Sequence, residues 1–223
     1  MKKLIVFTDL DGTLLDLHTY SFEKALPGLE RLRQKEVPLV FCSSKTRKEI
    51  EWYRRKMANH HPFIAETGGG IYIPSAYFPF ALEAPGPTCE NADEYLLIRL
   101  GARYAVLRSA LHDLKRQGFK VTGFGDMSVE QLMNLTGLDR AEAVMSHARE
   151  FDEPFIFKGS DGERQRLCGP GRDRLPPGAS VQSLEERIQG RPWRPCRPDL
   201  RNARRAHLRR HFRLRIHPGG RDR

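Results

Sequence analysis

Apolar and polar positions follow two alternating patterns in the first half of the chain. Residues 3–8 and 37–42 contain continuous apolar runs, which are typical of strands buried in a parallel sheet. Each run precedes a stretch with apolar positions at helical spacing, near 22–35 and after "SSKTR". The segment "FIAETGGGIYI" then predicts two short strands joined by a glycine turn. We therefore predict an α/β fold with a doubly wound, Rossmann-like parallel sheet, whose ligand site lies beyond the carboxyl ends of the strands.

The pattern changes at residues 83–93, "EAPGPTCENAD", which we interpret as a linker. A small α+β unit is predicted beyond it. Two of its helices begin with capping boxes, in which two polar side chains bind each other's backbone N–H groups. The predicted elements are strands at 94–100, 119–124 and 153–158, a helix at 103–117, and short helices beginning at Ser128 with Gln131 and at Asp139 with Glu142.

The positive charge of the chain is concentrated in its last quarter. Residues 168–223 hold fifteen arginines against five acidic residues, a surplus equal to the formal net charge of +10 of the whole chain. All ten lysines precede this segment. It contains seven prolines and only nine Leu, Ile, Val or Phe residues. The apolar residues of this segment are too few to offset the repulsion among its arginines. We therefore expect this segment not to fold stably.

The apolar runs and the cysteines bear on where the protein is expected to reside. No run approaches the ~20 apolar residues of a membrane-spanning helix, so we expect no membrane partner. The start, "MKKLIVFTDLDGT", partly imitates a signal peptide, but its apolar run stops at aspartates, and we interpret it as the first strand. The four cysteines show no metal-ligand spacing, so we expect reduced thiols in a cytoplasmic protein. They are Cys42, Cys89, Cys168 and Cys196.

Two carboxylates stand at the end of the first predicted strand. Asp9 and Asp11 would lie on the same side if the strand continued, and two such anions repel each other unless a cation or a reaction lies between them. Asp9 can attack phosphorus and form an aspartyl-phosphate. Asp11 can protonate the leaving oxygen and later deprotonate the attacking water. A Mg²⁺ ion held by both carboxylates would remove the repulsion. The alternative is a turn that is acidic by coincidence.

The stretch "DLDGTLLD" resembles the DxDGT signature of the haloacid dehalogenase-like phosphatases. Within that superfamily, "SSKTR", "AETGGGIYIP", "LTGLDRAEA" and "AREFDEPFIF" resemble the mannosyl-3-phosphoglycerate phosphatase family, and the resemblance covers residues 3–163. It implies a Mg²⁺-dependent phosphatase with a haloacid dehalogenase core. It also implies an inserted α+β cap domain that closes over a small-molecule sugar-glycerate phosphate.

The resemblance also implies individual site residues. Ser43 stands where a Ser or Thr of this superfamily donates a hydrogen bond to the phosphoryl group, and Ser44 and Lys45 complete the implied phosphate-binding set. The implied substrate-contacting residues at the junction of core and cap are Thr67, Gly68 and Gly69. Both sets have a simpler interpretation, since the serines suit a helix cap and the glycines suit a plain hairpin.

The implied division is a first half of the catalytic core at 1–84, a cap at 85–163 and a tail at 164–223. The family needs a lysine and a GDxxxD-type metal loop after the cap, and the sequence beyond residue 163 has neither, which leaves the core incomplete. "GFGDMSVE" imitates the loop through Gly125, Asp126 and Glu130, but it comes before the cap-like stretches.

The Arg-, Pro-, Gly- and Ala-rich tail without lysine suggests a frameshift near residues 163–168. The rival hypothesis is an Arg-rich extension that binds RNA or DNA, but only Trp193 and Phe212 could stack bases there. From the family resemblance we predict a phosphatase that converts mannosyl-3-phosphoglycerate to mannosylglycerate through an aspartyl-phosphate. The alternatives are a related phosphatase for another sugar phosphate and a non-catalytic remnant or nucleic-acid-binding protein. The patterns do not indicate an oligomeric state.

Overall fold

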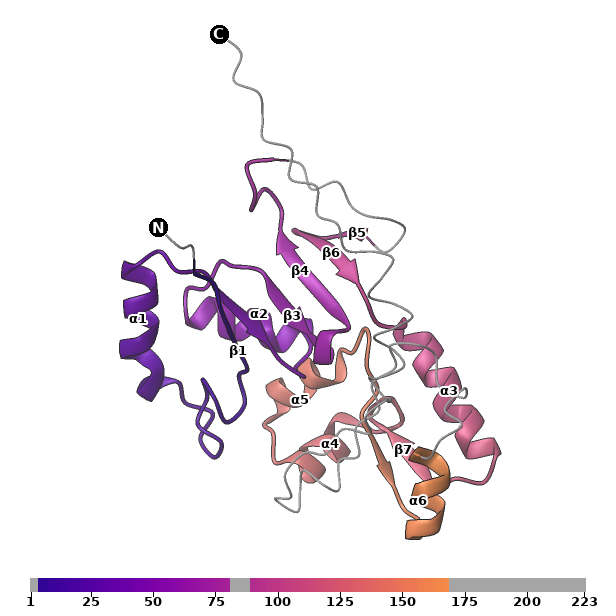
Figure 1. The fold of residues 1–223 in the computed structure, drawn as a ribbon. Helices are drawn as coiled ribbons and strands as arrows, with labels where there is room; N and C mark the ends of the chain where they lie inside the picture. Colours follow the sequence, from indigo (N-terminus) through magenta and orange to yellow (C-terminus); the bar gives the residue numbers. More distant parts are fainter. Residues whose placement is uncertain (1–3, 81–88, 169–223) are drawn as a thin grey trace. The chain divides into compact units, whose positions relative to one another are not determined.

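The computed structural model describes residues 4–80 and 89–168, and their largest element is a six-stranded sheet (Figure 1). The strand order is β1-β2-β3-β4-β6-β5. The first three of these strands are parallel, and the last three pair antiparallel. The strands are β1 (Val6–Thr8), β2 (Leu39–Cys42), β3 (Phe63–Ala65), β4 (Gly70–Pro74), β5 (Cys89–Ala92) and β6 (Tyr95–Arg99).

The helices of the first half form where the apolar spacing predicts them. A 3₁₀ turn, η1 (Glu23–Ala25), leads into α1 (Leu26–Gln34), which has a proline in its first turn. Helix α2 (Arg47–Lys56) begins at Thr46, whose side chain forms a capping box with Glu49. The apolar face of α2 is buried in the main core against strands β2 and β3. The buried residues shared by helix and sheet include Phe41, Ile50, Tyr53, Met57 and Phe63.

The α/β class is confirmed, but the sheet is mixed rather than wholly parallel. The turn after β3 reverses the chain, so β4 pairs antiparallel with β3 and the following strands continue that pattern. The linker prediction is wrong for Cys89–Ala92, which form β5 and pair with β6. Residues 83–88 of the predicted linker lie outside the described residues. Strand β6 pairs with β4, so the sheet continues beyond the predicted boundary at residues 84–85.

The later elements form around a second, two-stranded antiparallel sheet of β7 and β8. Both predicted capping boxes, at Ser128 and at Asp139, are confirmed. Residues 164–168, at the start of the predicted tail, belong to a helix. Residues 169–223, for which we expect no stable fold, lie outside the described residues. These elements are α3 (Tyr104–Arg116), β7 (Val121–Gly123), η3 (Phe124–Asp126), α4 (Val129–Thr136), α5 (Arg140–His147), β8 (Phe155–Phe157) and α6 (Asp161–Cys168). The division into core, cap and tail stays a prediction.

We expect Thr46→Ala to lower the free energy of unfolding by about 2 kcal/mol. The hydroxyl of Thr46 accepts the N–H of Glu49 at 3.2 Å and donates to the Met145 carbonyl at 2.9 Å, so its loss affects α2 and its contact with α5. Urea denaturation of the two proteins measures the difference. The control is Ser128→Ala, an exposed helix cap with one such bond, for which we expect about 0.5–1 kcal/mol. Equal losses in the two variants would contradict a role for the Met145 contact.

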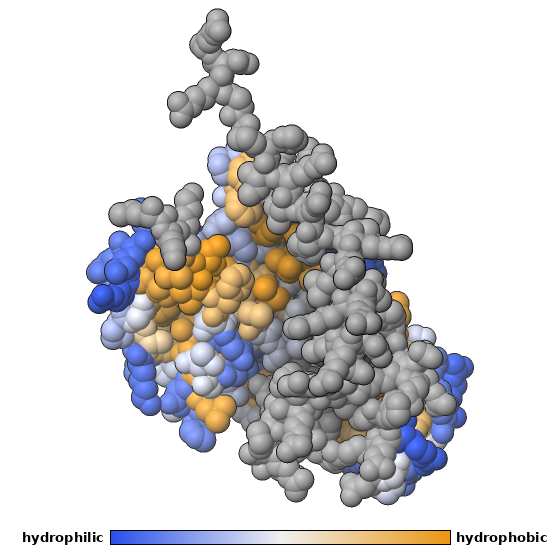
Figure 2. Space-filling view, in the orientation of Figure 1, coloured by the Kyte–Doolittle hydropathy of each residue, from blue (hydrophilic) through white to orange (hydrophobic). Residues whose placement is uncertain are grey.

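Strand β1 lies at one end of the described part of the sheet and leaves large apolar side chains exposed. Ile5 and Phe7 point to one side of the strand, and their exposed fractions are 53% and 62%. Figure 2 shows apolar surface in the region of this strand. An open strand edge flanked by apolar surface favours association with another chain.

We therefore expect the intact chain to elute as aggregates in size-exclusion chromatography, and Phe7→Lys to increase the monomer fraction. A charge on β1 opposes edge-to-edge pairing. Val144→Lys, at a half-exposed valine on α5, is the control and should leave the elution unchanged. A monodisperse monomer of the unmodified chain would contradict this prediction.

Candidate active site

The turn after β1 exposes Asp9 to solvent, and two buried leucines anchor this turn in the core. Leu10 and Leu15 are almost completely buried, and the Leu10 carbonyl accepts the N–H of Leu15 at 2.8 Å. The carboxylate of Asp9 accepts the N–H of Leu10 at 2.7 Å. Gly12 has a φ of 68°, a value that L side chains rarely adopt. The local sequence therefore directs an exposed carboxylate to the carboxyl end of the first strand.

Lys45 is the residue that the structure brings to the aspartate pair. Its Nζ lies 3.1 Å from Asp11 and 3.6 Å from Glu49, and the residue is only 8% exposed. Burial acts to lower the pKa of Lys45, but Glu49 and Asp11 outweigh it and hold that pKa above its ordinary value. A charged lysine therefore lies beside the predicted acid–base residue. Lys45 was predicted to bind phosphate, and its contact with Asp11 was not.

Backbone hydrogen bonds join the two other predicted groups of site residues. The N–H of Thr67 donates to the carbonyl of Ser43 at 3.1 Å, and the N–H of Glu66 donates to that of Lys45 at 3.0 Å. Ser43 is buried, and Ser44 is half-buried beside it. The loop after β2 and the turn after β3 are thus adjacent. Asp9 is near this loop as well, because its charge helps burial to raise the pKa of the Cys42 thiol at the end of β2.

The turn after β3 is strained. Glu66 and Thr67 have φ values of 51° and 58°, in the left-handed region that costs a non-glycine residue roughly 1 kcal/mol. Gly68 is also left-handed, and Gly69 is buried where a Cβ would meet Phe151 at 2.4 Å. The hairpin interpretation is correct as far as pairing goes, since the turn joins β3 to β4. Backbone strain of this kind is concentrated at functional sites, which favours the predicted substrate-contacting role of this turn. That role remains a prediction.

Sequence reasoning missed a buried ionic cluster beside this turn. Glu66 and Asp152 are buried, the side chain of Arg149 is 8% exposed, and Arg149 donates to the Asp152 carboxylate at 2.6 Å. Burial and the charge of Asp152 raise the pKa of Glu66 to about 7, although Arg149 opposes the shift. The signal was present in "AREFDEPFIF", where three acidic residues and an arginine interrupt an apolar stretch. The sequence does not indicate that Glu66 is the partner of these residues.

The acidic residues of the stretch "GFGDMSVE" pair with basic side chains. The carboxylate of Asp126 accepts hydrogen bonds from Arg108 and Lys115. Burial acts to raise the pKa of Asp126, but Arg108 and Lys115 hold it well below its usual range. Glu130 pairs instead with Arg140 at 2.8 Å. The two acidic residues therefore serve local ion pairs.

The predicted donors for a cation are Asp9 and Asp11. Within residues 4–80 and 89–168, no cluster of three or more His, Cys, Asp or Glu side chains could hold a metal ion. Mg²⁺ is commonly held by one or two carboxylates, with substrate phosphate and water completing the shell. An exposed Asp9 beside Asp11 fits that partial role. The same described residues include no helix long and apolar enough to cross a membrane.

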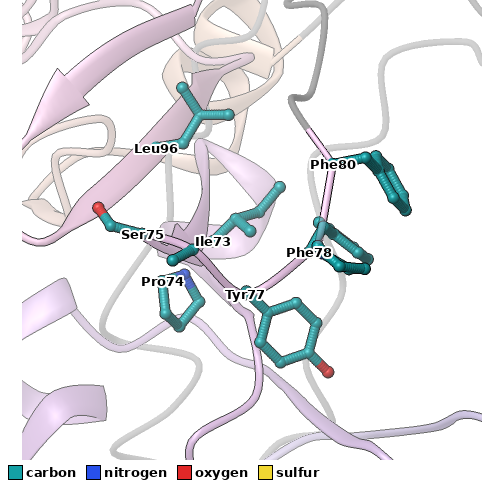
Figure 3. A pocket seen from close by; sticks show the side chains of 9 residues that line it. Ile73, Pro74, Ser75, Tyr77, Phe78, Phe80 and Leu96 are labelled. Atoms are coloured by element: carbon teal, nitrogen blue, oxygen red, sulfur yellow. The ribbon is translucent and has the colours of Figure 1, made fainter.

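A separate apolar groove lies along β4 and the residues after it (Figure 3). Its volume is about 470 Å³, and Tyr77, Phe78 and Phe80 follow one another along one side, with Leu96 contributed by β6. The Tyr77 hydroxyl lies 2.8 Å from Nδ1 of His61. None of the predicted site residues lines this groove, so it is distinct from the aspartate site.

Comparison with known proteins places the sequence beside a family of hydrolases. Residues 6–81 match the family described as haloacid dehalogenase-like hydrolase. The chain is 46% identical over 166 residues to a glucosyl-3-phosphoglycerate/mannosyl-3-phosphoglycerate phosphatase of Methanococcoides burtonii, covering 74% of this chain and 60% of that protein. It is 38% identical over 167 residues to a mannosyl-3-phosphoglycerate phosphatase of Pyrococcus furiosus, covering 75% of this chain and 66% of that protein. A solved structure of a hypothetical protein from Geobacillus kaustophilus aligns at a TM-score of 0.47 and 13% identity, covering 74% of this chain and 61% of that one.

The first part of the chain therefore belongs to the haloacid dehalogenase-like hydrolases. Within that class, the chain is related to the mannosyl-3-phosphoglycerate phosphatases, as the sequence motifs predicted. It spans about 55–66% of the length of the curated relatives that it matches.

Proposed function

We propose that this chain carries the nucleophile-bearing part of a phosphatase that hydrolyses a sugar-glycerate phosphate monoester, with mannosyl-3-phosphoglycerate as the favoured substrate. The observation that carries the proposal is the Asp9–Asp11 pair at the end of β1, with Lys45 at 3.1 Å from Asp11. The names of the relatives support the substrate class. The proposed setting is the cytoplasm, where such a small-molecule substrate would be made.

In the proposed mechanism, a carboxylate oxygen of Asp9 attacks phosphorus, and the bond between phosphorus and the ester oxygen breaks. Asp11 gives its proton to the leaving alcohol oxygen and then takes a proton from water. That water attacks the phosphorus of the aspartyl-phosphate, which releases inorganic phosphate and restores Asp9. Asp11 must be protonated for the first step. In this mechanism, the ammonium group of Lys45 therefore moves from Asp11 toward the phosphate when substrate binds.

The other predicted residues have binding roles in this mechanism. The hydroxyl of Ser43 would donate to a phosphoryl oxygen, and Ser44 and Lys45 would bind and neutralise the phosphate. The exposed Thr67 and the backbone of Gly68 and Gly69 would contact the sugar-glycerate. Asp9 and Asp11 would hold a Mg²⁺ ion, which supplies neutralisation of phosphate charge when bound.

The test is a phosphatase assay on a panel of sugar phosphates, with and without Mg²⁺. We expect Mg²⁺-dependent release of phosphate, fastest from mannosyl-3-phosphoglycerate. A faster release from a simple hexose phosphate would favour the alternative substrate class. Release that does not depend on Asp9 would contradict the proposed site.

A further inference from the structure

Three segments of the chain meet at the carboxylate of Glu66, which is 1% exposed. The side chain accepts the backbone N–H groups of Glu150, Phe151 and Asp152, at 2.9, 2.6 and 2.7 Å. The backbone N–H of Glu66 itself donates to the carbonyl of Lys45. One buried residue therefore connects the turn after β3, the loop after β2 and the segment between α5 and β8.

Arg149 connects two of the same segments. Its guanidinium donates to the carbonyl of Ser44 at 2.9 Å and to the carboxylate of Asp152 at 2.6 Å. The loop after β2, which carries the predicted phosphate-binding residues, is thus attached to the segment between α5 and β8 by a charged hydrogen bond. Such bonds are shorter and stronger than neutral ones.

Close backbone packing shows that this junction is closely fitted. A Cβ at Gly69 would lie 2.4 Å from Cβ of Phe151, and a Cβ at Gly101 would lie 3.1 Å from the same atom. The N–H groups of Leu100 and Gly101 both donate to the Gly69 carbonyl, at 2.9 and 2.8 Å. Phe151 is therefore seated directly on the glycine backbone that follows the strained turn.

We propose that Glu66 is a positioning residue of the candidate active site, which fixes the Thr67–Gly68 turn against the Ser43–Lys45 loop by binding the N–H groups of residues 150–152. The alternative is that Glu66 only fills space beneath the turn. The inference rests on the proposed function for the view that these two loops contact substrate. The junction itself is independent of catalysis.

The N–H groups of residues 150–152 distinguish the two roles, because a side chain that only fills space would not protect them, and the charge of Glu66 adds a dependence on pH. The charged and titratable groups that face Glu66 are Arg149, Glu150 and Asp152 on the segment after α5 and Tyr72 on β4, and Glu49 of α2 acts on it through Arg149. The pKa of Glu66 is about 7 in the closed junction, above the ordinary value of 4.5 that it regains when the junction opens. The closed junction therefore holds more protons, so it is strengthened as pH falls from about 7 toward 4.5 and weakened as pH rises.

The experiment is amide hydrogen exchange of the intact chain, corrected for intrinsic exchange rates, with Glu66→Ala, Glu66→Gln and Glu130→Gln. We expect Glu66→Ala to speed exchange at residues 150–152 and at Thr67 by roughly 10-fold or more, because buried N–H groups lose their acceptor. The amides within α3 should not change. Glu130→Gln, at an exposed glutamate paired with Arg140, is the control and should match the unmodified chain.

Glu66→Gln tests the charge, because it keeps an acceptor of the same shape. In the unmodified chain we expect protection of residues 150–152 to rise by about 3-fold or more between pH 8 and pH 5.5. In Glu66→Gln the rise should be smaller, because only Asp152 then titrates with a raised pKa in the junction. Wild-type exchange rates in Glu66→Ala, or an unchanged pH dependence in Glu66→Gln, would overturn the proposal. If Glu66→Ala does not fold, the Glu66→Gln profile decides alone. None of these readouts needs turnover, so an inactive chain would count against the proposed function only.

Discussion

Asp9→Asn is expected to reduce phosphatase activity by at least about 10³-fold, because the amide cannot form the covalent bond to phosphorus and a lost nucleophile typically costs that much or more. The fold should be retained, since Asp9 is exposed and an amide oxygen can accept the hydrogen bond that the Leu10 N–H donates to its side chain. The measurement is the initial rate with mannosyl-3-phosphoglycerate and Mg²⁺.

Because the chain spans 55–66% of its relatives, the rate is best measured in a chimera as well. In the chimera, residues 1–163 continue into the remaining part of the Methanococcoides burtonii phosphatase. Asp113→Asn is the control, since this half-exposed residue of α3 pairs with Arg116 in the same helix. Activity of the Asp9→Asn chimera above a tenth of that of its parent would show that Asp9 is not the nucleophile.

Arg149→Ala should lower the free energy of unfolding by about 3–5 kcal/mol, the usual cost of removing one partner of a buried ion pair. The substitution leaves Glu66 and Asp152 buried together without their cation, and Ser44 loses the donor to its carbonyl. For a chain of this size, about 2–4 °C is lost per kcal/mol, so the melting temperature should fall by roughly 6–20 °C. Arg140→Ala, at an exposed pair, is the control and should cost less than about 1 kcal/mol.

The pH dependence of this loss follows from the raised pKa of Glu66 and Asp152. Acids whose pKa is raised in the folded state stabilise it below the unfolded pKa and lose that contribution as pH rises through the folded pKa. Removing Arg149 raises both values further, so the defect should be larger at pH 8 than at pH 5.5. A defect of the same size at both values would show that packing of the arginine side chain, rather than its charge, supports the junction.

Elements with local causes could be predicted from the sequence. Strands β1 and β2 follow from continuous apolar runs, and the helix after Thr46 follows from apolar spacing. The helices after Ser128 and Asp139 follow from capping boxes that need only four consecutive residues. The aspartate pair could be placed at a strand end for the same reason. Each of these features depends on side chains that are close together in the sequence, so it can be predicted without knowledge of the tertiary structure.

The tertiary structure alone decided the features that join distant residues. Cys89–Ala92 lack an apolar pattern and become a strand only because β6 offers backbone partners. Lys45 reaches Asp11 because β1 and β2 are neighbours in the sheet. Glu66 meets the N–H groups of residues 84 to 86 positions later because the chain returns to β3 after α5. Such contacts are specified by strand order and chain reversal, which no local pattern of residues encodes.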